Sequence, residues 1–275
     1  MIVMRSQEGL RRALADLSGT LGFVPTMGAL HEGHLSLVTR ARSENGGCAV
    51  SLFVNPLQFD DAADYEAYPD TEAADLGLLE AAGVDVVLVG NKDDLYPPGF
   101  ATRVDLTGVT DGGEGGQRPG HFQGVCTVVA KLFGLFWPQR AYFGWKDMQQ
   151  LCVIRRLVKD LSMPIELVPC EIVREADGLA LSSRNRRLDA SERAAAPRLY
   201  RGLCAARELW HGGERAAAAL VQRVFEELGE NFPGDYVEVR DTTDYALVHD
   251  PVEHGRIVAA ARLGATRLLD NVSLS

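Results

Sequence analysis

Short apolar runs alternate with helical patterns over the first two thirds of the chain. Four apolar runs bounded by turn residues predict buried strands at 21–26, 49–54, 84–89 and 140–143. Apolar residues at spacings of three and four predict helices at about 35–41, 75–82, 125–136 and 149–161. Strands that alternate with helices form parallel sheets covered by helices. The sequence therefore predicts an α/β protein with a doubly wound parallel sheet.

The pattern changes after Val173. Two Ala-rich, charged segments at 191–209 and 216–228 are typical of surface helices, and strands are predicted at 236–240 and 256–261. These elements indicate a smaller α+β unit. We therefore predict two domains, 1–173 and 174–275.

A glycine-rich segment lies within the first domain at residues 108–120. It includes Glu114, Gln117 and Arg118 and has too few apolar residues to build a core. We predict a long surface loop, and long loops in compact domains are often functional.

The composition excludes several classes of function. A net charge of −10 over 275 residues repels nucleic acid phosphates, and no basic run offsets it. The five cysteines are scattered without the spacing of a metal site or redox pair, which is typical of thiols in a reducing cytosol. No run approaches the ~18 apolar residues that span a membrane. We expect a cytoplasmic protein with neither a nucleic acid nor a membrane as partner.

The first candidate site is the stretch 26–34, which contains His31 and His34 and lies between a predicted strand and helix. Backbone N–H groups and the helix dipole favour phosphate at such a turn. Two histidines three apart share one helix face, so both rings could reach a polyphosphate. Alternatively, one histidine caps the helix and the other is a surface residue.

The second candidate is Gly144, Trp145, Lys146 and Asp147, at the carboxyl end of a predicted strand. Ligands of open α/β sheets bind at this edge, and Lys146 could meet phosphate oxygens as a point charge. A solvated strand-to-helix turn is the alternative.

The third candidate is the segment 181–185, Leu-Ser-Ser-Arg-Asn. Two hydroxyl groups and a guanidinium on a loop are donors that could close on a triphosphate. An ordinary helix cap is the alternative interpretation.

Five strings occur in order along the chain: FVPTMGALHEGH, FVNPLQF, RPGHF, KDMQQL and DGLALSSRN. Together with DYVEVRD and AARLGATRLLDNV they resemble the pantothenate synthetases from about Phe23 to Asn271. The resemblance implies a Rossmann-like fold of the nucleotidyltransferase superfamily and a homodimer. It also implies that ATP and Mg²⁺ convert pantoate into pantoyl-adenylate, and that β-alanine then displaces AMP to give pantothenate, a step towards coenzyme A.

The resemblance also implies roles for individual residues. Catalysis and phosphate binding fall to His31, His34, Lys146, Ser182, Ser183 and Arg184, with His34 as the proton donor. The ATP site is completed by Pro25, Thr26, Met27, Gly28, Ala29, Leu30, Glu32, Gly33, Gly144, Trp145, Asp147, Val173 and Leu181. Pantoate and β-alanine are held by Gln58 and Gln150 with Met27, Asn55, Arg118 and His121, and Asp75 lies near the metal.

Trp145 departs from the family pattern, because most relatives carry Glu between this Gly and Lys. Another interpretation of the whole chain is a nucleotidyltransferase that keeps the nucleotide in its product. A further one is a module that binds ATP without turnover. Amine-dependent release of AMP separates the ligase from the first, and pyrophosphate release from the second.

Overall fold

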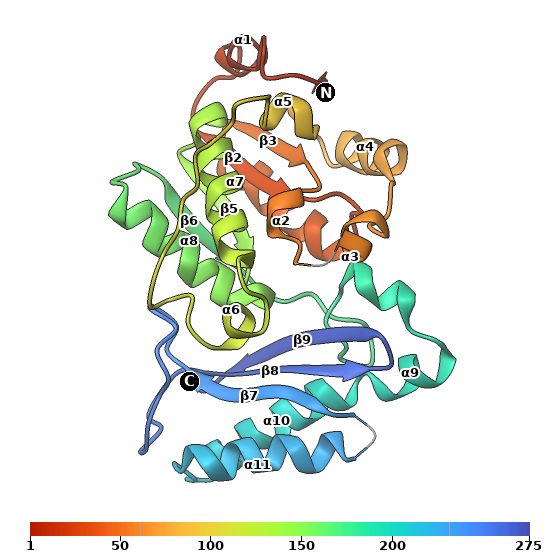
Figure 1. Ribbon diagram of the computed structural model, residues 1–275, viewed down its shortest axis with the longest axis vertical. Coiled ribbons are helices and arrows are strands. Elements are labelled where there is room, and N and C mark those ends of the chain that lie inside the picture. Colours follow the sequence, from red (N-terminus) through yellow and green to blue (C-terminus); the bar gives the residue numbers. More distant parts are fainter. Residues whose placement is uncertain (61, 231) are drawn as a thin grey trace. The chain divides into compact units, whose positions relative to one another are not determined.

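The computed structural model describes residues 1–60, 62–230 and 232–275. They form two compact units (Figure 1). The first unit comprises Met1–Gly144 and Val153–Cys170, and the second comprises Trp145–Cys152 and Glu171–Ser275. The boundary of independently folding domains at residue 173 remains a prediction.

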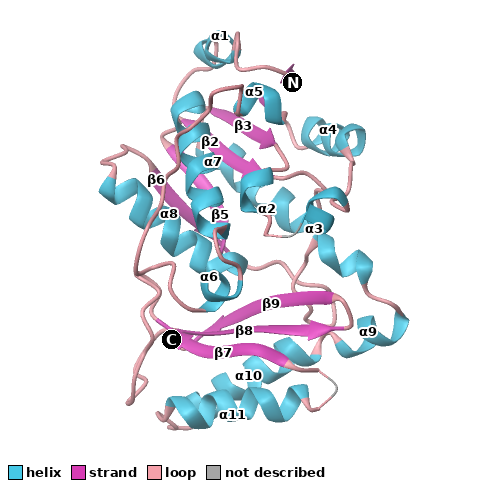
Figure 2. Ribbon diagram, in the orientation of Figure 1, coloured by secondary structure: helices cyan, strands magenta, loops and turns pink. Residues whose placement is uncertain are grey.

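The first unit contains a six-stranded sheet in which every pairing is parallel (Figure 2). The strand order is β1-β4-β3-β2-β5-β6. The strands are β1 (Ile2–Met4), β2 (Leu21–Thr26), β3 (Gly47–Leu52), β4 (Val86–Val89), β5 (Arg140–Gly144) and β6 (Glu166–Cys170). The predicted α/β class with a doubly wound parallel sheet is confirmed.

Helices lie on both faces of this sheet, with α2 (Glu32–Glu44) on one and α7 (His121–Phe136) on the other. The first unit also contains α1 (Leu10–Ala15), α3 (Ala62–Glu66), α4 (Glu72–Ala81), α5 (Lys92–Leu95), α6 (Gly113–Gln117) and most of α8 (Met148–Asp160). Val38 of α2 packs in one apolar cluster with Val24 and Tyr142. Phe136 of α7 stacks on Phe23 with ring centroids 4.2 Å apart. Because Phe23 and Val24 are successive strand residues, they point to opposite faces.

The winding reverses direction at β2. The chain passes from β2 to β3 and β4 on one side, whereas β5 pairs with the other side of β2 through Phe23 and Ala141. The carboxyl ends of β2 and β5, at Thr26 and Gly144, therefore flank a topological switch point, where ligands of such sheets bind. Two of the candidate segments follow these two ends.

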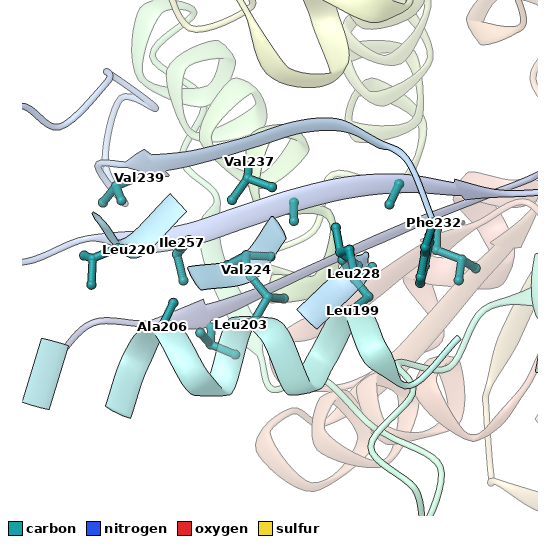
Figure 3. Packing of buried hydrophobic residues seen from close by; sticks show 14 of the residues in the cluster. Leu199, Leu203, Ala206, Leu220, Val224, Leu228, Phe232, Val237, Val239 and Ile257 are labelled. Carbon is teal, nitrogen blue, oxygen red and sulfur yellow. The ribbon is translucent and has the colours of Figure 1, made fainter. Parts of the chain in front are cut away.

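The second unit packs helices against one small antiparallel sheet. The sheet runs β7 (Gly234–Arg240), β8 (Arg256–Leu263) and β9 (Thr266–Ser273), and the helices are α9 (Ala190–Ala195), α10 (Arg198–His211) and α11 (Ala217–Leu228). Leu203 and Val224 from the helices meet Val237 and Ile257 from the sheet in a buried apolar cluster (Figure 3). The α+β character is as predicted. The helix expected at 191–209 is instead two helices, because Pro197 separates them and cannot donate a backbone hydrogen bond.

The segment 108–120 differs from the predicted surface loop. It contains α6, and Gly113 and Glu114 are buried. A Cβ on Gly115 would lie 1.9 Å from the carbonyl oxygen of Thr110. The glycines thus allow two backbone segments to approach closely. The low apolar content of segment 108–120 gave no sign of this packing.

None of the five cysteines, all of which lie among the described residues, is joined in a disulfide; four of them are buried and Cys204 is half-buried. Burial raises the pKa of Cys48 and Cys126 to about 12. These two thiols are therefore protonated and unreactive at neutral pH. Among the described residues, no helix is both long and apolar enough to cross a membrane.

We expect Gly124→Ala to lower the free energy of unfolding by about 2–3 kcal/mol, because the added Cβ overpacks a backbone contact. That Cβ would lie 2.2 Å from the carbonyl oxygen of Leu57, in the segment on which α7 packs. Gly134→Ala is the matched control in the same helix, with no atom within 4 Å of its Cβ. It should gain up to about 1 kcal/mol from helix propensity. Urea unfolding of both variants measures the difference, and equal stabilities would contradict the close approach.

Candidate functional site

The loop after β2 makes a tight turn before α2. Thr26 donates its hydroxyl to the carbonyl oxygen of Ser51 at 2.8 Å and accepts from the amide of Gly28 at 3.2 Å. Gly28 and Ala29 both have positive φ, 82° and 51°. An Ala in this region is strained, so surrounding contacts must hold it there.

Asp75 supplies those contacts from α4. Its Oδ2 accepts from the amide of Ala29 and its Oδ1 from the amide of Leu30, each at 2.9 Å. The hydroxyl of Thr71 donates to the same Oδ2 at 2.9 Å. Asp75 is 3% exposed. Amide donors replace the water that a buried carboxylate has lost, so Asp75 both is stabilised by the loop and holds it.

The backbone N–H groups expected to bind phosphate here are thus largely engaged within the protein. The amides of Ala29 and Leu30 donate to Asp75, that of Gly28 to Thr26, and that of Gly33 to His31. The expectation of free amides at this turn is therefore corrected. An anion at this loop would be met chiefly by side chains.

His31 and His34 form a reciprocal cap at the start of α2. His31 Nδ1 accepts from the amide of Gly33 at 3.1 Å, and His34 Nδ1 accepts from the amide of His31 at 3.3 Å. Their ring centroids are 4.1 Å apart. Because each Nδ1 is an acceptor, each neutral ring carries its proton on Nε2. The sequence offered two alternatives, a joint role for the two rings or a helix cap formed by one of them. In the structure both histidines cap the helix, and a proton on Nε2 makes each ring a possible donor as well.

The predicted substrate residues of the first unit form one hydrogen-bonded group around Gln58. Its side chain accepts from Asn55 Nδ2 at 3.0 Å and donates to Met27 Sδ at 3.1 Å. The backbone carbonyl oxygen of Gln58 contacts Arg118 NH2 at 3.2 Å and His121 Nδ1 at 2.8 Å. The structure therefore brings together five residues that lie up to 94 positions apart in the sequence.

Arg118 adds positive charge to this group. Its Nε lies 3.2 Å from Asp60 Oδ1, and its side chain is 17% exposed. Asp60 neutralises the guanidinium only in part, since this carboxylate is itself more exposed. A carboxylate ligand is compatible with such a site.

In the second unit, a short 3₁₀ turn at Trp145–Asp147 carries Lys146. Lys146 Nζ lies 3.5 Å from Asp147 Oδ1. Asn271 of β9 donates through Nδ2 to the carbonyl oxygens of Trp145 at 2.9 Å and Lys146 at 3.2 Å. The guanidinium of Arg256 lies 4.9 Å from the Trp145 ring centroid and its Nε donates to Asn271 Oδ1. Asn271 and Arg256 therefore fix the backbone that carries Lys146.

The third candidate segment, 181–185, directly follows a narrow hairpin in which Arg174 pairs with Ala180. The amide of Leu181 donates to the carbonyl oxygen of Val173 at 3.0 Å. This bond joins two residues that were predicted to bind the nucleotide. Ser182 caps the following 3₁₀ helix (Ser183–Arg187), because its Oγ accepts from the amide of Arg184 at 3.3 Å. The predicted capping role of this serine is present, and a phosphate role remains a prediction.

The predicted site residues fall in both units. The first unit holds residues 25–34 with Asn55, Gln58, Asp75, Arg118, His121 and Gly144; the second holds Trp145, Lys146, Asp147, Gln150, Val173, Leu181, Ser182, Ser183 and Arg184. Gln150 lies half-buried in the first turn of α8.

A direct bond from Asp75 to Mg²⁺ does not fit this geometry. Its two oxygens already accept three hydrogen bonds and the side chain is buried. Within residues 1–60, 62–230 and 232–275, no three His, Cys, Asp or Glu side chains gather as a metal site. The residues therefore fit a metal carried by a phosphate ligand better than one resident in the protein.

Sequence reasoning missed the residues that hold the site residues in place: Thr71, Tyr96, Arg256 and Asn271. Each acts through a partner that is distant in sequence or on another element, so no local spacing marks it. Asn271 lies in a string used only for the family resemblance, and Tyr96 lies in none of the strings.

The family model for pantoate-beta-alanine ligase matches residues 2–273. A pantothenate synthetase from Cereibacter sphaeroides is 51% identical over 275 residues, covering 98% of each chain. The crystal structure of pantothenate synthetase from Thermus thermophilus superposes with a TM-score of 0.94 at 46% identity, over 100% of this chain and 99% of that one. A pantoate-beta-alanine ligase from Francisella tularensis, complexed with beta-gamma ATP and beta-alanine, gives a TM-score of 0.82 at 33% identity, over 100% and 98%.

We expect Asp75→Asn to increase amide hydrogen exchange at Ala29 and Leu30 by about tenfold, since weakening one charge-assisted bond costs ~1.5 kcal/mol. Asp85→Asn is a matched control, because Asp85 Oδ2 accepts from the amide of Cys48 at 2.8 Å outside this loop. The control should leave exchange at Ala29 and Leu30 unchanged. Equal protection of the loop in Asp75→Asn and the parent protein would remove Asp75 as its anchor.

Proposed function

Because the chain belongs to the pantoate-beta-alanine ligase family, we propose that its two sets of site residues act in an adenylate mechanism. The enzyme condenses pantoate with β-alanine in an ATP-dependent reaction. The pantoate carboxylate oxygen attacks the α-phosphorus of ATP and pyrophosphate leaves. The amine of β-alanine then attacks the acyl carbon of pantoyl-adenylate, loses a proton and releases AMP, giving pantothenate.

The reciprocal cap of His31 and His34 is the observation that carries the phosphate assignment. Both Nδ1 atoms accept backbone bonds, which leaves the proton of each neutral ring on Nε2. Two such donors on adjacent rings suit the oxygens that gain charge as pyrophosphate departs. His34 acts as the proton donor. Met27 and the rest of segment 25–34 bind the nucleotide.

Four donors from the second unit complete the phosphate assignment: Lys146, Ser182, Ser183 and Arg184. Support comes from the Lys146 backbone, which Asn271 holds through two carbonyl oxygens. A fixed backbone reduces the reorganisation needed when negative charge develops. Gly144, Trp145, Asp147, Val173 and Leu181 bind the remainder of ATP.

Pantoate and β-alanine are assigned to the group around Gln58, with Gln150 from α8. Asn55, Met27 and His121 surround Gln58 through the contacts described above. Arg118 brings positive charge towards substrates that both carry a carboxylate. Neutral amides suit pantoate because they can bind its hydroxyl and carboxylate oxygens at once.

Magnesium enters this proposal as part of the MgATP substrate. Phosphate oxygens are its ligands, and the ion neutralises charge on the triphosphate. In this proposal Asp75 is not a ligand of the ion; it acts only by holding the loop at Ala29 and Leu30. We also assign the enzyme to the cytoplasm as a homodimer, as the family resemblance and the free thiols suggest.

The deciding assay measures AMP formed from MgATP with pantoate and β-alanine, each omitted in turn. AMP should require both, and pyrophosphate release in a single turnover should require pantoate alone. A product that retains the nucleotide would overturn the ligase mechanism. Bound ATP without pyrophosphate release would indicate a binding protein.

We expect His34→Ala and Lys146→Ala each to slow adenylate formation by about 10²–10³, the cost of losing one donor to transition-state charge. Pantoate affinity should change far less, because both groups meet charge that develops during displacement. Rapid-quench measurement of pyrophosphate release tests the rate. An unchanged single-turnover rate in either variant would withdraw that residue from the phosphate site.

We expect Gln150→Ala to raise the KM for pantoate by about fivefold, because one neutral hydrogen bond contributes ~1 kcal/mol. Its KM for ATP should stay nearly constant. Gln123→Ala provides an amide-to-Ala control, since no site role is assigned to its side chain. Equal increases in the two KM values of Gln150→Ala would contradict a pantoate-specific role.

A further inference from the structure

We propose that Tyr96 is a positioning residue that orients the amide of Gln58 through Asn55. The chain of contacts is Tyr96 hydroxyl to Asn55 Oδ1 at 2.9 Å, then Asn55 Nδ2 to Gln58 Oε1 at 3.0 Å. This inference rests on the proposed role of Gln58 in pantoate binding. It adds a residue from outside the predicted site and specifies which end of Gln58 meets substrate.

The orientation of the Asn55 amide is set by its four partners. Oδ1 accepts from the amide of Leu57 at 3.2 Å and from the Tyr96 hydroxyl. Nδ2 donates to the carbonyl oxygen of Gly124 at 3.1 Å and to Gln58. A flipped amide would set Nδ2 against the N–H of Leu57 and Oδ1 against the carbonyl of Gly124. Asn55 is 1% exposed, so water cannot repair those losses.

The orientation of Asn55 fixes that of Gln58. Since Asn55 presents a donor, Gln58 must turn Oε1 towards it, and Gln58 Nε2 then lies 3.1 Å from Met27 Sδ. The sulfur is a weak acceptor that a better one can replace. Gln58 therefore offers N–H towards the nucleotide loop. It suits a carboxylate or hydroxyl oxygen of pantoate and disfavours an ammonium group at that position.

Tyr96 is well suited to this role. It directly follows α5, and its ring packs against Phe53 and Phe100 with centroids 5.8 and 4.8 Å away. Burial raises the pKa of Tyr96 above its ordinary value. The hydroxyl is therefore protonated throughout the physiological range, and the Phe neighbours hold the ring in place even without it.

Tyr96→Phe removes the hydroxyl and keeps the ring. We expect a rise of about fivefold in the KM for pantoate, the value of one hydrogen bond transmitted to substrate. The KM for MgATP and kcat should each stay within about twofold. Initial rates of AMP formation with the full-length enzyme provide all three values.

Tyr142→Phe is the matched control. Its hydroxyl also contacts an Asn amide, 2.6 Å from Asn45 Nδ2, and it donates to Glu44 at 2.9 Å. These partners lie at the end of α2 and belong to no predicted substrate group. Tyr142→Phe should lower Tm and leave the KM for pantoate unchanged, which separates general destabilisation from positioning.

A double-mutant cycle tests whether Tyr96 acts through Gln58. Gln58→Ala should raise the KM for pantoate, and adding Tyr96→Phe to it should cause no further rise. Additive effects in the cycle, an unchanged KM in Tyr96→Phe, or equal changes in all KM values would each overturn the positioning role. A parent enzyme that forms no pantoate-dependent AMP would instead refute the proposed function.

Discussion

The arrangement of the first unit's site depends on one buried carboxylate that accepts backbone N–H groups. Asp75 binds the amides of Ala29 and Leu30, and Thr71 reinforces it from the start of the same helix. These bonds hold Ala29 in a left-handed conformation that an alanine would otherwise avoid. The chain can then turn from β2 into α2 within a few residues. The start of α2, and with it the relative placement of His31 and His34, follows from this constraint.

The same constraint changes how the loop can meet an anion. A helix N-terminus ordinarily offers bare amides to phosphate, but here an internal carboxylate and the two histidines use several of them. An anion at this loop would therefore be met by side chains that are themselves held by hydrogen bonds to the backbone. Gln58 follows the same principle, because Asn55 and the backbone partners of Asn55 determine which end of its amide faces outward. For Gln58, a buried amide with four hydrogen-bond partners sets the polarity of the side chain that we propose meets pantoate.

The sequence predicted the fold where periodicity is local and strong. The apolar run 21–26 coincides with β2, and the pattern at 125–136 lies within α7. Strands β1, β6 and β9 were missed, because β1 is three residues long, β6 contains Pro169, and β9 has Arg267 and Asp270 among its apolar residues. Spacing and family resemblance identified the candidate groups that carry charge. They could not identify Thr71, Tyr96 or Asn271, because hydrogen bonds between distant segments assign those roles and leave no periodic signal in the sequence.

Trp145 illustrates how one position can change chemistry while the backbone is kept in place. A Glu there, as the family resemblance implies, could pair with Arg256 through its charge, whereas Trp145 offers the face of its ring to the same guanidinium. Burial lowers the pKa of Arg256, and the charges of Glu171 and Asp270 oppose that shift. Its intrinsic pKa is so high that the side chain remains a cation. Arg256 in turn donates to Asn271, which holds the carbonyl oxygens of Trp145 and Lys146. The tryptophan therefore retains a cation contact and leaves the hydrogen bonds that fix Lys146 intact.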